Sequence, residues 1–435
     1  MKAKTQNRSR GSFLYPDLMD QLDPEHPLLQ LAKQIPWQRF EDEFSGYYSE
    51  MGRPAKPIRL MVGLMILKQL ENLSDERVVE VWVQNPYYQA FCGETHFQWQ
   101  LPCDPTDFVY FRKRIGEEGT RLIFESSVQI HGEEAKEAEV TVDTTVQEKN
   151  ITFPTDLKLL SKIIKKCREI AKEANITLRR SFRRELPSLL RQRIKSKKIV
   201  KRVRTMAGVL IRELERKLPK ETLARYAEQL QLFRKVHGQK RSDKNKIYSL
   251  HEPDVLCIGK GKEHKKYEFG RKASIIWTKT TGIIVGAMSF TKNVYDGHTL
   301  PEVLEQTWQI TQTCPKVAIC DRGYKGYQDV GDIKILRPGR PKKNDTPYQR
   351  RIARERFRRR AGIEPIIGHL KQDHRMARNY LKGVLGDAIN LFMAAAAYNF
   401  RKWIRKLGHF LALFTFWLFC GTKCRQLYMM PSTGR

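Results

Sequence analysis

Glu364 lies among basic residues at helical spacing. Phe357, Arg360 and Lys371 stand at positions −7, −4 and +7 from the glutamate. Because each residue of a helix turns by about 100°, these side chains return to one helix face. A carboxylate between cations suits metal-dependent chemistry on a phosphodiester, since it can hold a divalent ion while the cations bind phosphates. Pro365 disfavours helical geometry at Glu364, so the helix is expected to kink or restart there.

Two aspartates stand at the ends of predicted strands. Asp143 lies near the end of the Val- and Thr-rich strand 138–146, and Asp321 follows the short apolar strand 317–320. With Glu364 they form three carboxylates that could converge and hold two Mg²⁺ ions, for which Mn²⁺ can substitute. One ion would activate water or a DNA 3′-hydroxyl, and the other would stabilise the leaving oxygen. The sequence therefore predicts a metal site for phosphoryl transfer.

Each of these carboxylates also has a purely structural interpretation. Asp143 could bond to the backbone of Thr145, and Asp321 could be a turn residue because Arg-Gly follows it. Glu364 could form an ion pair one helical turn from a cation. A purely structural role for all three carboxylates, each at a strand or helix end, is a weaker interpretation than a shared metal site.

Other polar residues in or beside the predicted core compete with these three. Glu252, Asp254 and Asp296 rank second as metal ligands. Asp296 precedes a glycine and the start of a helix, which favours a turn or capping role. His298 could bind a metal, but a polar loop histidine is more often solvated.

The residues after Asp321 are expected to contact DNA. Lys325 follows by four residues and can reach a phosphate, and Arg322 is a further phosphate ligand. Tyr324 could stack on a base or pack beneath the site, and the sequence leaves both open.

Residues 1–135 read as mostly helical. The apolar segment 58–72 follows Pro57 and is apolar almost all round, so a buried helix is expected. Ser74 is the predicted N-cap of a helix at 75–83.

A further short helix is predicted after Thr106, its expected N-cap. It carries Arg112 and Arg114, which are expected to bind phosphates. Successive short helices ending in basic residues fit a helix-turn-helix DNA reader or a small bundle with a basic surface, and both remain open.

Residues 156–246 form a basic segment with Leu and Ile at helical spacing. They hold 29 Lys and Arg against 9 Asp and Glu, and 191–204 is the densest part. This stretch carries more than half of the net charge of 80 − 48 = +32. A solvated arm is the ordinary interpretation, but charge on this scale favours contact with a polyanion such as DNA.

Outside this segment the predicted elements alternate between strands and helices. Apart from one missing helix, their order matches a ribonuclease-H-like core. The fold class expected is therefore mixed α+β, with a ribonuclease-H-like catalytic core, a helical N-terminal domain and a long basic helical insertion after the first core strand. The predicted later elements are a hairpin of strands at 267–278 and 282–290, a helix at 300–311, a strand at 332–336, and helices at 351–380 and 386–406.

The predicted division of the chain follows from these elements. It comprises a helical DNA-binding or dimerisation region at 1–135, the first core strand at 136–155, the basic insertion at 156–250, the rest of the catalytic domain at 251–406, and an apolar tail at 407–435.

Composition narrows the class of protein further. Aromatic residues make up 10% of the chain, which is unlike a disordered basic tail. The eight cysteines form no Cys-x2-Cys pair, which fits a reducing compartment. The N-terminus lacks the apolar core of a signal peptide, and the apolar run 410–420 is too short to span a bilayer. A soluble cytoplasmic protein that does not enter the membrane is expected.

With these residues assembled, the chain resembles the DDE transposases of bacterial insertion sequences, in the IS-four/IS-five superfamily. Residues 141–145 resemble the first-Asp strand, 321–326 the second-Asp motif, and 357–371 the signature Tyr-x2-Arg-x3-Glu-x6-Lys. Phe357 replaces the signature tyrosine, which removes a hydroxyl and leaves the metal ligands intact. Supporting matches are 52–54, 111–114, 267–272, 295–298 and 383–390.

The resemblance implies a bacterial, nucleoid-associated homodimer. Such a protein binds terminal inverted repeats, cuts DNA at the element ends and joins the 3′-OH to target DNA. Composition and spacing alone imply only a metal-dependent enzyme acting on nucleic acid. A nuclease of the same fold and a non-catalytic DNA-binding relative are the alternatives.

Overall fold

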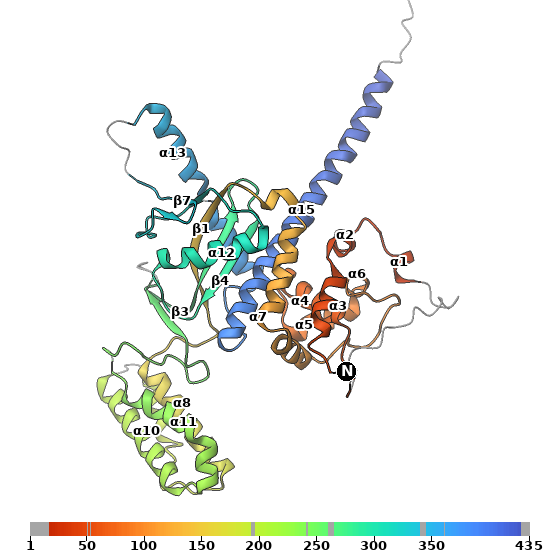
Figure 1. Ribbon diagram of the computed structural model, residues 1–435. Helices are drawn as coiled ribbons and strands as arrows, with labels where there is room; N and C mark the ends of the chain where they lie inside the picture. Colours follow the sequence, from red (N-terminus) through yellow and green to blue (C-terminus); the bar gives the residue numbers. More distant parts are fainter. Residues whose placement is uncertain are drawn as a thin grey trace, which may run out of the picture. The chain divides into compact units, whose positions relative to one another are not determined.

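The computed structural model describes residues 17–49, 51–52, 54–192, 196–240, 242–259, 265–339, 345–360 and 362–427 (Figure 1). Within these ranges the side chains of 353, 356, 358–360, 363 and 409–427 are not described. The chain forms two compact units. The first unit comprises Met1–Gln147 and Lys272–Arg435, and the second comprises Glu148–Arg271.

Helices of the N-terminal region pack around a central apolar helix. That helix, α4 (Ile58–Leu70), is buried along nearly its whole length because its apolar residues encircle it. It packs against α3, α5, α7 and the C-terminal helix α15. The elements are α1 (Leu18–Gln21), α2 (Pro27–Gln34), α3 (Trp37–Ser45), α4, α5 (Asp75–Gln84), α6 (Pro86–Phe91), α7 (Pro105–Gln129) and η1 (Gly132–Ala135).

Two predicted N-caps have different outcomes. Ser74 caps α5 as predicted, because its hydroxyl accepts a hydrogen bond from the backbone N–H of Arg77 at 3.1 Å. The prediction that Thr106 caps the next helix is wrong. Asp104 caps α7 instead, and the Asp107 carboxylate bonds back to the Asp104 N–H in a capping box. The helix is also longer than predicted and kinks at Gly116, where φ is 63°.

Seven strands form a mixed sheet. Its order is β2-β3-β1-β5-β7-β6, and β4 pairs with β3 on a branch off this path. β1 pairs parallel with β5, β5 pairs parallel with β7, and the β2–β3, β3–β4 and β6–β7 pairs are antiparallel. The strands are β1 (Glu139–Glu148), β2 (Leu256–Gly259), β3 (Tyr267–Thr278), β4 (Ile284–Phe290), β5 (Val317–Ile319), β6 (Asp329–Val330) and β7 (Ile333–Leu336).

The helices that follow complete the first unit. Both α12 and α15 pack on β4, and α15 also runs beside α7 (Figure 1). These elements are η2 (Asp296–Thr299), α12 (Leu300–Thr311), α13 (Pro347–Arg360), α14 (Ile363–Gln372) and α15 (Gly383–Leu427). The mixed α+β class is therefore confirmed. The helical stretch predicted at 351–380 restarts near Glu364, as expected from Pro365, because α13 ends at Arg360 and α14 begins at Ile363. Its predicted end is wrong, since α14 stops at Gln372.

The second unit contains four helices with an apolar core of their own. Leu and Ile side chains at helical spacing on α8 and α10 are buried against each other, as are Leu230 and Phe233 of α11. The helices are α8 (Asp156–Glu173), α9 (Glu185–Arg191), α10 (Lys197–Lys217) and α11 (Lys220–Gly238). The predicted basic insertion at 156–250 falls within the bounds of this unit.

Across the described residues of both units, no helix combines the length and apolar character needed to cross a membrane.

Candidate nucleic-acid processing site

The pairing of β1 with β5 governs the positions of two predicted metal ligands. These strands are parallel, with Thr141 opposite Ile319. Continuing that register by two residues brings Asp143 opposite Asp321. Neighbouring strands lie about 4.8 Å apart, and residues two apart face the same side. Both aspartates are half-buried. The strand pairing therefore places these two carboxylates side by side on neighbouring segments, with Asp321 two residues after the end of β5. The prediction that Asp143 lies near the end of its strand is wrong, because β1 continues to Glu148 and Asp143 lies in its middle.

Each aspartate side chain accepts a hydrogen bond from the backbone N–H of the residue that follows it. Asp143 Oδ1 accepts from the N–H of Thr144 at 2.8 Å, and Asp321 Oδ1 accepts from the N–H of Arg322 at 2.6 Å. The structural alternative for Asp143 was a bond to the backbone of Thr145, and the bond observed is to that of Thr144. Two partly buried carboxylates offer the oxygen ligands that a hard divalent cation prefers, so the donor set fits Mg²⁺.

Asp296 has a role that the sequence did not indicate. Its Oδ1 accepts hydrogen bonds from Thr144 Oγ1 at 2.9 Å and from Lys272 Nζ at 2.7 Å. The interpretation of Asp296 as a turn-forming or capping residue is wrong in this respect, because its side chain does not cap η2. The side chain instead links η2 to Lys272 of β3 and to Thr144 of β1, the residue after Asp143. Lys272 Nζ also donates to the carbonyl of Val294 at 2.7 Å.

The loop after Asp321 is held against η2. The Tyr295 hydroxyl donates to the carbonyl of Gly323 and accepts from the N–H of Lys325 at 3.1 Å. Gly297 is buried where a Cβ would lie 2.6 Å from the Lys325 carbonyl oxygen, which is closer than Cβ contacts allow. A glycine at this position therefore permits the close approach of the loop that carries Asp321.

Tyr324 lies inside the protein and not at its surface. Its side chain is 1% exposed, so the predicted stacking on a base is wrong and the packing alternative holds. Burial raises the pKa of the Tyr324 phenol well above its usual value, and the negative charges of Asp143 and Asp296 raise it further. The phenol therefore stays protonated beside these carboxylates. Its backbone carbonyl accepts from Arg337 Nη1 at 2.9 Å, which ties the loop to the end of β7.

Glu364 is placed differently from the two aspartates. It lies exposed in the first turn of α14, whose N-cap is Gly362. Phe357 belongs to α13, which ends at Arg360, whereas Glu364 belongs to α14, which begins at Ile363. The helix thus restarts just before Glu364, as Pro365 led us to expect. Among the described residues, no group of three or more His, Cys, Asp or Glu side chains is arranged to hold a metal ion. The strand register, continued by two residues, puts Asp143 opposite Asp321, whereas Glu364 lies on a separate helix.

The predicted phosphate ligands occupy varied positions. Arg322 and Lys325 are exposed beside Asp321, and Lys371 is half-buried on α14. Arg114 is exposed, with its guanidinium 4.3 Å from the centre of the Tyr48 ring. The Arg360 side chain falls outside the described part of the chain.

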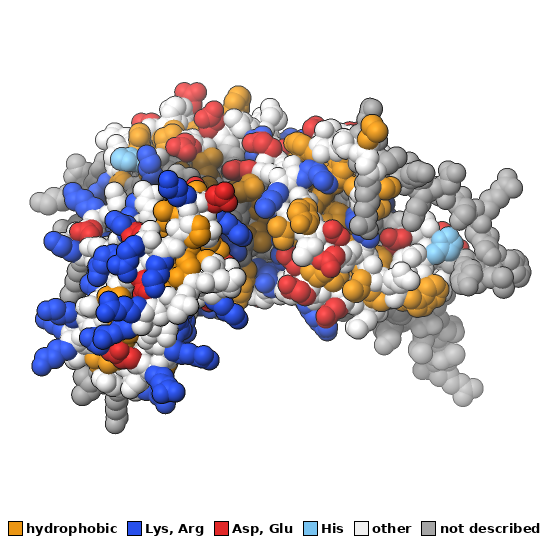
Figure 2. All heavy atoms as spheres, turned by 90° about the horizontal axis from the view of Figure 1, so that it is seen from below, with side chains coloured by type: hydrophobic (Ala, Val, Ile, Leu, Met, Phe, Trp, Pro, Cys, Tyr) orange, Lys and Arg blue, Asp and Glu red, His pale blue; other side chains and the backbone are white. Residues whose placement is uncertain are grey.

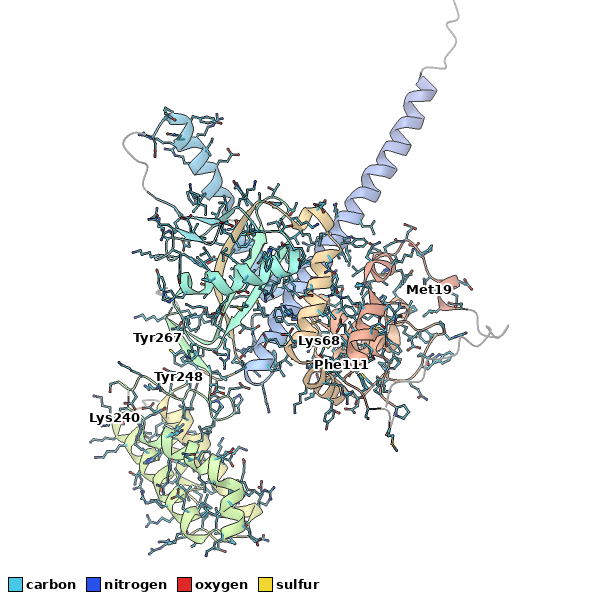
Figure 3. All side chains as sticks on the ribbon, in the orientation of Figure 1. Met19, Lys68, Phe111, Lys240, Tyr248 and Tyr267 are labelled. Carbon is cyan, nitrogen blue, oxygen red and sulfur yellow. The ribbon has the colours of Figure 1, made fainter. Side chains whose placement is uncertain are left out.

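Arg112 is a correction to the sequence prediction. Its side chain is 8% exposed and donates to both oxygens of Asp75, at 2.9 and 2.7 Å. Lys68 Nζ lies 2.7 Å from the same carboxylate (Lys68 is labelled in Figure 3). Burial lowers the pKa of Lys68 to about 8, and Asp75 partly offsets this effect. Arg112 therefore stabilises the N-terminal bundle and is not available to DNA.

The motif at 383–390 forms part of a buried hydrogen-bond network. Asn390 Nδ2 donates to Gln147 Oε1 at 2.9 Å, and Gln147 Nε2 donates to the Asp387 carbonyl at 3.0 Å. Asn379 Nδ2 donates to Asp387 Oδ1 at 2.7 Å. These bonds fix α15 to the end of β1, four residues beyond Asp143. The polar residues of this motif are thus structural.

The other competing polar residues are Glu252 and Asp254 of the second unit and His298 of η2. Glu252 is buried and forms a salt bridge of 3.5 Å with Lys149 within the second unit, where Asp254 is exposed. His298 is exposed, with its ring packed near Tyr295.

Comparison with known proteins gives the class of molecule. A family model described as "Transposase domain (DUF772)" matches residues 16–114, and one described as "Transposase DDE domain" matches residues 233–400. The chain is 44% identical over 177 residues to "Uncharacterized protein ORF8 in nfe locus" of Rhizobium meliloti, covering 39% of this chain and 86% of that protein. No solved structure matches the chain. With matches to both transposase models, the chain belongs to the DDE transposase family.

Proposed function

We propose that this protein is a transposase of the IS-four/IS-five superfamily that cuts DNA at the ends of its element and joins the 3′-OH ends to target DNA. The observation that carries the proposal is the register of β1 and β5, which puts Asp143 opposite Asp321. Two carboxylates opposite each other on neighbouring segments of the sheet suit metal-assisted attack on a phosphodiester. The domain order expected from the sequence, with a basic insertion after the first core strand, is part of this proposal.

The sheet order supports a ribonuclease-H-like core. Strands β4, β3, β1, β5 and β7 lie in that order, with β3 central between β4 and β1. Hydrogen bonds from Lys279 N to Glu139 O and from Lys149 N to Phe269 O run at opposite ends of β1, as in an antiparallel pair. Three antiparallel strands followed by two parallel ones agree with the strand arrangement expected for this core.

The metal-binding residues in this proposal are Asp143, Asp321 and Glu364, with Mg²⁺ as the cofactor and Mn²⁺ as its substitute. Bound ions would supply positive charge to the attacking and leaving oxygens of the phosphodiester. Asp143 and Asp321 have the oxygen donors and partial burial for this role. Glu364 would join them from the first turn of α14, where its exposure leaves it accessible to DNA.

Other side chains would position the DNA and keep the carboxylates in place. Arg322 and Lys325 are exposed within four residues of Asp321, where they can bind the phosphates flanking the scissile bond. Arg360 and Lys371 would do the same from α13 and α14. Lys272 balances the charge of Asp296, which limits repulsion among the acidic groups around Tyr324.

The proposed partners follow from the reaction and the charge. A net charge of +32 favours binding to DNA, and Arg114 on the N-terminal bundle supports a role for that region at the inverted repeats. A homodimer at the nucleoid would bring two element ends together.

A cleavage and strand-transfer assay tests this function. A labelled duplex carrying the terminal inverted repeat of the element is incubated with Mg²⁺ and either wild type or Asp143→Asn, Asp321→Asn or Glu364→Gln. Metal-dependent joined products with wild type, absent in all three variants while DNA binding persists, are expected. Cut but unjoined DNA would indicate a nuclease. Binding without chemistry in wild type would indicate a DNA-binding relative, and cleavage retained in one variant would remove that residue from the site.

A further inference from the structure

A hollow rimmed by arginines opens on the second unit. It encloses about 330 Å³ and is lined by residues of α10 and of the segment between α8 and α9. The residues that matter here are Arg179, Arg180, Phe182, Arg202, Arg212 and Arg216, and we call this feature the arginine hollow. All five arginines are exposed. Figure 2 shows many Lys and Arg side chains, and few Asp and Glu side chains, on this unit at the lower left.

The arginines of α10 line up along one face of the helix. Arg202, Val209, Arg212 and Arg216 are separated by seven, three and four residues, which are spacings that return to the same face. At 1.5 Å per residue, the stripe from Arg202 to Arg216 is about 21 Å long. Its cations are therefore spread along a line and not gathered at one point.

Most of these guanidinium groups have no carboxylate partner. Arg202 pairs with Glu185 at 2.7 Å. For the side chains of Arg180, Arg212 and Arg216, the described part of the chain provides no salt bridge or hydrogen bond. Leaving several arginines unpaired and close together is unfavourable through mutual repulsion. Such an arrangement suits an external anion.

A buried carboxylate of α10 also lines the hollow. Glu213, with 5% of its side chain exposed, accepts from the N–H of Arg179 at 2.7 Å and from Lys217 Nζ at 2.8 Å. Lys217 Nζ also donates to the carbonyl of Thr177 at 2.7 Å. These bonds fasten the segment carrying Arg179 and Arg180 to α10. The rim arginines are thus held by the fold.

We propose that the arginine hollow binds the sugar–phosphate backbone of DNA, with one strand running along the α10 stripe. The proposal rests on the proposed function, which supplies DNA as the substrate. Guanidinium groups bind phosphate oxygens bidentately, and the half-buried Phe182 and Val209 and the buried Met206 offer an apolar wall to the deoxyribose.

An extended polyanion fits the stripe better than a compact one. A free phosphate or a mononucleotide would occupy one part of a 21 Å line, whereas a DNA strand presents successive phosphates along it. An acidic peptide would meet the same arginines, but its charge is less regularly spaced. The surrounding stretch, with 29 basic and 9 acidic residues, attracts DNA over a longer range.

The test compares two triple variants of the full chain with equal charge changes. The first is Arg180→Gln with Arg212→Gln and Arg216→Gln. The matched control is Lys165→Gln with Lys220→Gln and Lys235→Gln, three exposed residues of the same unit outside the hollow. Binding to the element-end duplex is measured from 50 to 200 mM salt, and thermal unfolding confirms that both variants are folded.

Loss of three phosphate contacts would make the negative slope of log K against log salt less steep by about 2 to 3, since each contact contributes about 0.9. The control, acting only through the screened field, is expected to make it less steep by less than about 1. Equal slopes for the two triple variants would overturn the proposal. If the wild type joins DNA ends but the two triple variants have equal salt slopes, only the proposal for the arginine hollow is rejected. If the wild type neither cuts nor joins DNA, the proposed function is rejected.

Small anions and peptides are tested in the same samples. Inorganic phosphate, a mononucleotide and a poly-glutamate peptide are titrated against wild type and the arginine triple variant. Weak binding of each, with the arginine-dependent salt slope confined to DNA, supports the proposal. Arginine-dependent binding of one of these probes, without a change in the DNA slope, would assign the hollow to that ligand instead.

Discussion

Lys272 Nζ lies 2.7 Å from Asp296 Oδ1, and this pair joins β3 to η2 beside the strand that carries Asp143. Only 11% of the Lys272 side chain and 32% of the Asp296 side chain are exposed. The same carboxylate oxygen accepts the Thr144 hydroxyl. Two of the short motifs that carry the family resemblance, at 267–272 and 295–298, thus meet at one ion pair. Its position indicates a supporting role for the Asp143–Asp321 pair.

Replacing Lys272 by Met is expected to impair both stability and cleavage. The change leaves the Asp296 carboxylate without its counter-charge, close to other acidic groups. A partly exposed pair such as this one is expected to cost about 2 kcal/mol in the free energy of unfolding. DNA cleavage should fall at least about tenfold as Thr144 and η2 shift. Urea unfolding and the element-end cleavage assay measure these effects.

The double variant Lys272→Met with Asp296→Asn is the control for this pair. Removing both charges should restore more than half of the lost stability, because no unpaired carboxylate remains. A double variant no more stable than Lys272→Met alone would show that Lys272 acts by packing and not by its charge.

Regular elements were predictable where local pattern determines them. The helix at 300–311 was predicted with the bounds it has, because its apolar spacing and Pro301 define it locally. Strands β2 and β6 were not predicted, since strands of four and two residues carry almost no periodic signal. Pro365 predicted a kink or restart of the helix near Glu364, and α14 does begin at Ile363.

Pairings between distant residues explain most of what the sequence did not reveal. Arg112 lies in a basic cluster but pairs with Asp75, 37 residues away. Lys272 and Asp296 are 24 residues apart and meet only because the sheet folds them together. Asp143 and Asp321, by contrast, were identified because each lies in or just after a strand with a recognisable pattern, although Asp143 lies in the middle of β1 and not near its end. Strand patterns are a local signal, whereas ion-pair partners depend on the tertiary fold.

Gly297→Ala is expected to separate stability from activity. The new methyl group would lie 2.6 Å from the Lys325 carbonyl oxygen, so the loop from Asp321 to Lys325 must shift. A displacement of about 1 Å at a reacting group can lower the rate about 100-fold. Cleavage kinetics and thermal unfolding should show a large loss of rate with a small change in Tm. Gly238→Ala, where the added methyl group meets nothing, should leave both unchanged.

Arg112→Gln is expected to act on folding and not on DNA. Removing one partner of a buried, bidentate ion pair costs about 3 kcal/mol or more, although Lys68 still contacts Asp75. The salt slope of DNA binding should stay unchanged. Arg114→Gln is the matched comparison: the exposed residue should cost less than about 1 kcal/mol. If Arg112→Gln is as stable as wild type but its slope of log K against log salt is less steep by about 0.9, Arg112 contacts DNA after all.

His374 is expected to make the first unit sensitive to acid. The ring is 2% exposed and Nδ1 lies 3.2 Å from the Gln69 carbonyl oxygen, which the neutral ring can satisfy by donating. Burial lowers the pKa of His374 to about 4 from the ordinary value of 6.5. The unfolded chain therefore binds more protons between these values, and stability falls as the pH drops from 6.5 towards 4. The shift corresponds to at most about 3 kcal/mol. Urea unfolding of wild type and His374→Gln at pH 7 and pH 4.5 isolates this contribution, because other titrating groups are shared. The advantage of wild type should shrink at the lower pH, and a difference that is constant between the two would mean that His374 titrates normally in the folded protein.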